Sequence, residues 1–97
     1  MKINFTGNGM AITPALQQFT QEKFNKLERH FDKIISVSVT FMVEKRMQIA
    51  EANVIVHKSE LHAQAESENM YTAIDSLVEK LDKQLIKYKE KTQGHRE

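Results

Sequence analysis

Two rows of basic side chains stand out in this chain, because their spacing suits the binding of a polyanion. In each row the charges recur every three or four residues, which brings them onto one flank of a predicted helix. The first row is Lys23, Lys26, Arg29 and Lys33, with His30 beside it, and the second is Lys80, Lys83, Lys87 and Lys91. Like charges at these spacings lower helix stability. Binding to a polyanionic partner would explain why the chain has like charges at these spacings despite the loss of helix stability.

The rows predict a local positive field that the net charge conceals. Fourteen Lys and Arg against 13 Asp and Glu give a net charge of +1, yet eight of the 14 basic residues belong to the two rows. If the helices run side by side and parallel, the rows form two ridges with a groove between them. The alternative is ordinary solvation of two surface helices, with Glu79 and Lys83 adding a few tenths of a kcal/mol. On the second helix Asp75, Glu79, Asp82 and Glu90 fall on the opposite flank from the lysines.

Lys23 has two possible roles. Its angular position falls inside the apolar stripe of the first helix, between Phe19 and Leu27, where an apolar residue would pack better. The side chain either extends along the edge of the sheet to reach water or places its ammonium group in the groove. The sequence leaves both possibilities open.

Catalytic and metal-binding chemistry has little support in the sequence. His30, His57, His62 and His95 belong to no nucleophile, metalloprotease or phosphate-loop motif, so we predict no enzyme, no cofactor and no small-molecule substrate. His57 and His62 are expected on the open face of the sheet, where they could share a divalent ion with Glu60. Surface histidines without a bound metal are the favoured interpretation, because two His lack a fixed third ligand.

The segment Gly7-Asn8-Gly9 also has two interpretations. It could form a nest of backbone amides for a phosphate. A loop between strand and helix that needs positive φ accounts for the glycines without a ligand, and we favour it.

Six predicted strands and helices determine where the two basic rows lie. Alternating patterns predict strands over residues 2–6, 35–44, 51–57 and 61–66, and helical periodicity predicts helices from Pro14 to about Asp32 and from a cap at Ser67 or Asn69 to about Gln93-Gly94. A turn near Lys58-Ser59 would pair His57 with Glu60. Every strand is apolar on one face only, so both helices should cover that face.

The predicted fold is therefore a two-layer α/β (α+β) sandwich of order β-α-β-β-β-α. A mixed four-stranded sheet carries two roughly parallel helices on one face, and residues 1–97 form a single domain about 25 to 30 Å across. The other face of the sheet carries the polar residues Ser36, Ser38, Thr40, Asn53, His62 and Gln64. Because bases stack on exposed aromatic side chains, this face is not expected to bind single-stranded RNA. Among the modes of RNA binding, recognition of the backbone and shape of structured or double-stranded RNA therefore remains.

Composition agrees with a folded intracellular protein. The chain has 97 residues, of which 40% are hydrophobic and 28% charged, and it has no Cys. Disulfides, thiolate catalysis and Cys-based zinc sites are thus excluded. No apolar run reaches the length of a signal peptide or a membrane span, so we expect a cytoplasmic location and no membrane partner.

Several segments carry a resemblance to a known family. They are Ile3-Asn4-Phe5-Thr6-Gly7-Asn8, Ile12-Thr13-Pro14-Ala15-Leu16, Lys23-Phe24-Asn25-Lys26-Leu27-Glu28, Met70-Tyr71-Thr72-Ala73-Ile74-Asp75 and Lys80-Leu81-Asp82-Lys83-Gln84-Leu85. They resemble the bacterial ribosome hibernation-promoting factors. That family includes the ribosome-associated translation inhibitor and has been called the sigma-54 modulation family. The resemblance covers essentially the whole chain, and the family fold is also β-α-β-β-β-α.

The resemblance implies binding to the small ribosomal subunit and the 70S ribosome, in the channel where messenger RNA and the anticodon ends of transfer RNAs lie. It implies a block of translation in stationary or stressed cells and promotion of inactive 100S dimers. The implied contacts to 16S rRNA are Lys23, Lys26, Arg29, Lys80, Lys83, Lys87 and Lys91, with Lys33 added from its place in the first row. Lys45 and Arg46, at a hairpin tip, match the family less closely and are secondary candidates.

Members of the family differ in the segment on the C-terminal side of this domain. Only His95-Arg96-Glu97 come after the second predicted helix, so we expect the short type without a dimerisation domain, for which 100S formation would require ribosome modulation factor. Two other hypotheses stay open, a general module for double-stranded RNA and a regulatory domain that binds an acidic protein. Comparing affinity for duplex RNA and for intact small subunits separates the first, and absence of ribosome co-sedimentation would indicate the second.

Overall fold

The structure is a computed structural model that describes residues 2–31 and 33–93, with side chains as far as Glu90. Its elements are β1 (Ile3–Asn8), α1 (Pro14–His30), β2 (Ile34–Glu44), β3 (Met47–Val56), β4 (Ser59–Ser67) and α2 (Met70–Gln93). The predicted order is confirmed. The predicted helix ends at Asp32 and Gly94 lie outside the described residues. β1 continues through Gly7 to Asn8, two residues past the predicted end.

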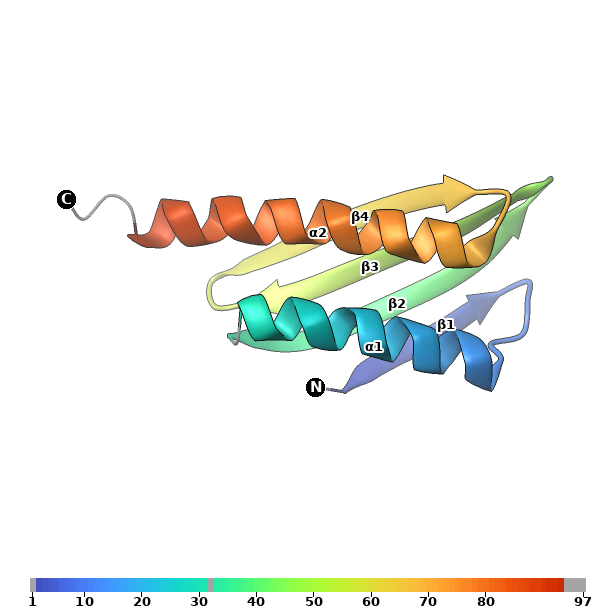
Figure 1. Ribbon diagram of the computed structural model, residues 1–97, viewed down its shortest axis with the longest axis horizontal. Helices are drawn as coiled ribbons and strands as arrows, with labels where there is room; N and C mark the ends of the chain where they lie inside the picture. The colour runs from blue at the N-terminus through green and yellow to red at the C-terminus, as the bar shows by residue number, and fades with distance from the viewer. Residues whose placement is uncertain (1, 32, 94–97) are drawn as a thin grey trace.

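The sheet is mixed and the helices share one of its faces. Its order is β1-β2-β3-β4, with β1 parallel to β2 and the other two pairs antiparallel. Figure 1 shows α1 and α2 side by side and running in the same direction, with α2 on the β4 side. The two-layer sandwich with roughly parallel helices is confirmed. None of the helices in the described part of the chain is long and apolar enough to cross a membrane.

Side-chain caps set where both helices begin. The Thr13 hydroxyl accepts a hydrogen bond from the Leu16 N–H at 3.1 Å, and Pro14 occupies the first helical position, where its missing N–H is not needed. Asn69 Oδ1 accepts hydrogen bonds from the Tyr71 N–H at 2.8 Å and the Thr72 N–H at 3.4 Å. Of the two predicted caps, Asn69 is therefore the one that starts α2, and the Ser67 hydroxyl supports it by accepting from the Asn69 N–H at 3.2 Å.

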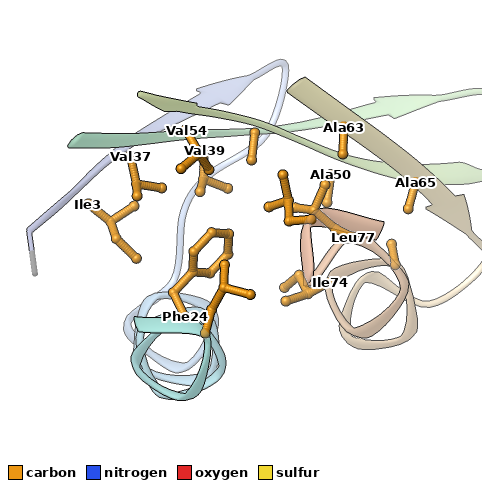
Figure 2. Packing of buried hydrophobic residues seen from close by; sticks show 14 of the residues in the cluster. Ile3, Phe24, Val37, Val39, Ala50, Val54, Ala63, Ala65, Ile74 and Leu77 are labelled. Carbon is orange, nitrogen blue, oxygen red and sulfur yellow. The ribbon is translucent and has the colours of Figure 1, made fainter. Parts of the chain in front are cut away.

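The core lies between the helices and the sheet, as Figure 2 shows. Phe24 of α1 is fully buried beneath β-strand valines, and Ile74 and Leu77 of α2 face alanines of β3 and β4. Small side chains beneath α2 let that helix lie close to the sheet. The predicted stripes of both helices are confirmed by the buried residues Leu16, Phe24, Leu27, Phe31, Met70, Ala73, Ile74, Leu77, Leu81 and Leu85.

The β3–β4 register differs from the prediction. Val56 pairs with Ser59 and Ile55 with Glu60, so the turn is His57-Lys58, with Lys58 at φ 66°. The predicted pairing of His57 with Glu60 is wrong by two residues. A shift of two leaves every side chain on its original face, so the alternation of apolar residues could not detect it. His57 consequently lies in the turn and not on the open face of the sheet.

Gly7, near the end of β1, and Gly9, in the loop before α1, are required for different reasons. Gly9 has φ 76°, as the positive-φ interpretation predicts. Gly7 is instead required by a close approach, because a Cβ there would lie 2.4 Å from the Met10 carbonyl oxygen.

The molecule is more elongated than predicted. Its principal extents are 48 × 23 × 19 Å, so the expected 25 to 30 Å is wrong for the longest dimension. The 24 residues of α2 contribute about 36 Å of this length, and the β2–β3 hairpin reaches beyond the start of α2 (Figure 1). Figure 1 shows α2 extending beyond the end of α1.

Candidate nucleic-acid interface

Lys23 lies in the space between the two helices and has a partner there. Its Nζ is 3.0 Å from Asp75 Oδ1 of α2 and 5.3 Å from the centroid of the Phe19 ring. The Lys23 side chain is 31% exposed and that of Asp75 is 53% exposed. Of the two roles left open by the sequence, the ammonium group is thus in the groove. Its charge is matched by a carboxylate of the same chain.

The groove between α1 and α2 has one basic and one acidic wall. It is lined by Lys23, Lys26, Leu27 and His30 of α1 and by Thr72, Asp75, Ser76, Val78, Glu79 and Asp82 of α2. His30 Nδ1 lies 3.5 Å from Asp82 Oδ1, a second side-chain contact across the groove. The predicted groove between two basic ridges is therefore wrong. We call Asp75, Glu79 and Asp82 the acidic strip.

The basic row of α2 lies on the side of the helix toward the β4 edge. Lys80 Nζ donates a hydrogen bond to the Gln64 carbonyl oxygen of β4 at 2.7 Å, and Lys87 lines a shallow hollow with Ser59 and Leu61. Lys83 is exposed. The side chain of Lys91 lies outside the described residues. The lysines and the acidic strip are thus on opposite flanks of α2, as predicted. Glu90, which was predicted on the acidic flank, instead lines the same hollow as Lys87.

The direction of the helices explains why the rows do not face each other. Both rows occupy the same flank relative to the core stripe, and α1 and α2 run in the same direction on one sheet face (Figure 1). The same flank of two parallel helices points the same way in space. The row on α1 therefore faces α2, while the row on α2 faces away from α1 and toward β4.

Three side chains of α2 cover the free edge of β4. Besides Lys80, Gln84 Nε2 donates to the His62 carbonyl oxygen at 2.8 Å, and the Tyr88 hydroxyl donates to the His57 carbonyl oxygen. These residues are four apart, so they follow one side of the helix. They satisfy outward carbonyl groups of the β4 edge and its turn, and they hold the lysine row of α2 against that edge.

The exposed cations of α1 point away from the sheet. Lys26 and Arg29 are exposed, and Lys33 is exposed just beyond the helix. The secondary candidates Lys45 and Arg46 are exposed in the β2–β3 turn, where Lys45 has φ 58°. That turn is at the end of the molecule where α1 and α2 begin, so it lies away from the C-terminal members of both rows (Figure 1).

The open face of the sheet contains a close contact between a histidine and a glutamate that sequence reasoning missed. His62 Nε2 is 2.6 Å from Glu51 Oε2. In the observed register Asn53 is opposite His62 and Glu51 is the diagonal neighbour on the same face, whereas the predicted register places Ile55 opposite His62, so the sequence pattern did not reveal this partner. The hypothetical ion site of His57, His62 and Glu60 is not assembled, since His57 is in the turn. Within residues 2–31 and 33–93, no three His, Asp or Glu side chains are grouped so as to hold a metal.

Comparisons with known proteins agree on one family. The family described as Sigma 54 modulation protein / S30EA ribosomal protein matches residues 3–93. A protein of Klebsiella oxytoca named ribosome hibernation promoting factor is 48% identical over 95 residues, which cover 98% of this chain and 100% of the relative. A protein of the same name from Azotobacter vinelandii is 50% identical over 91 residues, covering 94% of this chain and 85% of the relative.

Solved structures share the fold over nearly the whole chain. A ribosomal subunit interface protein from Coxiella burnetii superposes with a TM-score of 0.88 at 40% identity, covering 92% of this chain and 98% of that one. The N-terminal domain of Thermus thermophilus Protein Y gives a TM-score of 0.84 at 25% identity, covering 91% and 99%.

Proposed function

The chain belongs to the Sigma 54 modulation protein / S30EA ribosomal protein family, and on this premise we propose that it is a ribosome hibernation factor that represses translation. The observation that carries the proposal is nearly half identity, over almost the full length, to proteins named ribosome hibernation promoting factor. The exposed cations on both helices support it, since binding to rRNA depends on phosphate contacts.

We propose that the binding site is on the small subunit, in the channel for messenger RNA and transfer RNA. Two sets of side chains would contact 16S rRNA, namely Lys26, Arg29 and Lys33 from α1 and Lys80, Lys83, Lys87 and Lys91 from α2. Lys23 would contribute mainly by holding α1 to Asp75. Lys45 and Arg46 would add contacts at the opposite end. An elongated body 23 × 19 Å in cross-section suits a channel.

Two further properties belong to the same proposal. Bound factor would favour paired, inactive 100S ribosomes in cooperation with ribosome modulation factor, and its site of action would be the cytoplasm, where ribosomes are. Sucrose gradients of purified 70S ribosomes with this protein, with and without ribosome modulation factor, test the pairing. A 100S peak should require the second factor.

The binding site is tested by a charge-reversal variant. Lys83→Glu/Lys87→Glu removes two exposed cations of α2 and leaves the Lys80 hydrogen bond to Gln64 in place. The variant should lose co-sedimentation with small subunits while circular dichroism stays unchanged. Lys2→Glu/Lys58→Glu is the matched control, because both residues are exposed, lie outside α1 and α2 and give the same change in net charge.

The outcomes distinguish the proposal from its alternatives. Normal co-sedimentation of the Lys83/Lys87 variant would contradict the role of α2. Equal affinity of the unmodified protein for small subunits and for duplex RNA would favour a general module for double-stranded RNA. No ribosome binding at all would favour a domain that binds an acidic protein.

A further inference from the structure

The acidic strip separates the two basic rows on the surface of the helical layer. Asp75 and Asp82 face Lys23 and His30 across the groove, and Glu79 lines the same groove on α2. The α2 lysines begin on the far side of the strip, with Lys80 already at the β4 edge. From α1 across α2 to the β4 edge, the surface is therefore first basic, then acidic, then basic again.

The strip presents negative charge to any RNA above the groove. Asp75 is 53% exposed although it pairs with Lys23, and Glu79 is exposed and makes no ion pair within the part of the chain that the structure describes. Lys83 is one helical turn from Glu79, so a phosphate on that lysine lies within a Debye length of the strip. A backbone placed along the groove would meet these carboxylates.

The consequence differs for two kinds of RNA. A continuous duplex carries closely spaced phosphates along both strands, so any placement that contacts both rows also brings phosphates near the strip. A folded RNA surface on which two separate backbone segments flank a gap can contact both rows and leave the strip facing the gap.

We infer that Asp75, Glu79 and Asp82 are specificity-determining residues, which select two separate RNA backbone segments over a continuous duplex. The inference deepens the proposed function and rests on it. The strip weakens binding to generic duplex RNA and leaves each row available to its own segment. The Lys23–Asp75 ion pair and the His30–Asp82 contact also join the two helices across the groove.

The test neutralises the strip without adding cations. Asp75→Asn/Glu79→Gln/Asp82→Asn should bind a 20-base-pair RNA duplex of arbitrary sequence about five- to tenfold more tightly, because each carboxylate about 8 Å from a phosphate in water contributes about a factor of two. The preference for small subunits over duplex should fall by a similar factor. The single variant Glu79→Gln, which breaks no ion pair of the described residues, should gain about twofold on the duplex.

The matched control raises the net charge equally elsewhere. Glu60→Gln/Glu66→Gln/Glu68→Gln removes three exposed carboxylates outside the groove. Its duplex affinity should rise less than that of the strip variant, because these carboxylates lie outside the groove and do not stand between the two rows. Duplex affinity that is unchanged in the strip variant, or raised equally in the control, would overturn the inference. Failure of the unmodified protein to bind small subunits would instead overturn the proposed function, whatever the duplex measurements show.

Discussion

Lys23 and Lys26, which are three residues apart on α1, should differ in their contribution to rRNA binding. Lys23 is 31% exposed and paired with Asp75, whereas Lys26 is exposed. A phosphate must compete with Asp75 for the first ammonium group but not for the second. We predict that Lys26→Gln weakens small-subunit binding about three- to tenfold and flattens the slope of log affinity against log salt by about one, and that Lys23→Gln weakens it less than about twofold.

The same pair provides a stability measurement. A partly exposed ion pair contributes about 0.2 to 1 kcal/mol, so Lys23→Gln should lower the free energy of unfolding by no more than that. Urea titration measures it. If Lys23→Gln reduced subunit affinity as strongly as Lys26→Gln at unchanged stability, Lys23 would be a direct RNA contact.

For single residues, the sequence predicted the location of a side chain on its helix better than it predicted which residue that side chain contacts. The start of the first helix at Pro14 was predicted correctly, because the Thr13 hydroxyl and the proline beside it both act locally. Lys23 was placed inside the apolar stripe, between Phe19 and Leu27, but its partner Asp75 is 52 residues away in the chain. Which carboxylate it meets depends on how two helices are placed on a sheet, and residue spacing within one helix contains no such information.

At the scale of the elements, the end of β1 and the loop that follows it lead to a prediction about Gly7 and Gly9. An alanine Cβ at Gly7 would lie 2.4 Å from the Met10 carbonyl oxygen and 3.0 Å from Ile12, so the backbone must shift. At Gly9 there is open space, and the cost is only that of φ 76°. We predict that Gly7→Ala destabilises by about 1 to 3 kcal/mol and Gly9→Ala by about 1 to 2 kcal/mol, as measured by thermal unfolding. A smaller loss for Gly7→Ala than for Gly9→Ala would contradict the close-approach explanation.

The side chains that join α2 to the β4 edge make a second prediction. Gln84→Ala removes the donor to the His62 carbonyl oxygen and should lower the free energy of unfolding by about 0.5 to 1.5 kcal/mol. Lys83→Ala, on the exposed side of the same helix, is the control and should change stability by less than about 0.5 kcal/mol. Equal effects would indicate that helix propensity alone, and not the hydrogen bond to β4, is being measured.

Element order and layer arrangement could be predicted because each strand is apolar on one face and each helix has one stripe. The β3–β4 register could not, since pairings two residues apart give identical faces and only the turn at Lys58 decides. The basic residues within the described part of each helix were assigned to the correct flank, whereas Lys33 lies beyond the end of α1. The prediction that the two rows face each other was wrong, because the same flank of two parallel helices points in the same direction in space.

The shape of the whole molecule leads to a prediction about competition on the ribosome. The body is 48 Å long and 23 × 19 Å in cross-section, with both proposed contact rows on the helical layer. If it lies along the decoding channel, as proposed, a solid domain of that thickness fills the space that messenger RNA and the anticodon ends of transfer RNAs need. Occupancy by the factor and by transfer RNA should therefore be mutually exclusive.

Preformed complexes of small subunit, messenger RNA and initiator transfer RNA should resist the factor, and the factor bound first should block transfer RNA. Filter binding of labelled transfer RNA, with the factor titrated in, measures the competition. Lys83→Glu/Lys87→Glu should lose the ability to compete, and Lys2→Glu/Lys58→Glu should retain it, because only the first removes proposed rRNA contacts. Stable binding of factor and transfer RNA to the same subunit would contradict the channel site. It would leave the family membership and the basic rows intact, since a cationic surface of this length can bind rRNA elsewhere on the subunit.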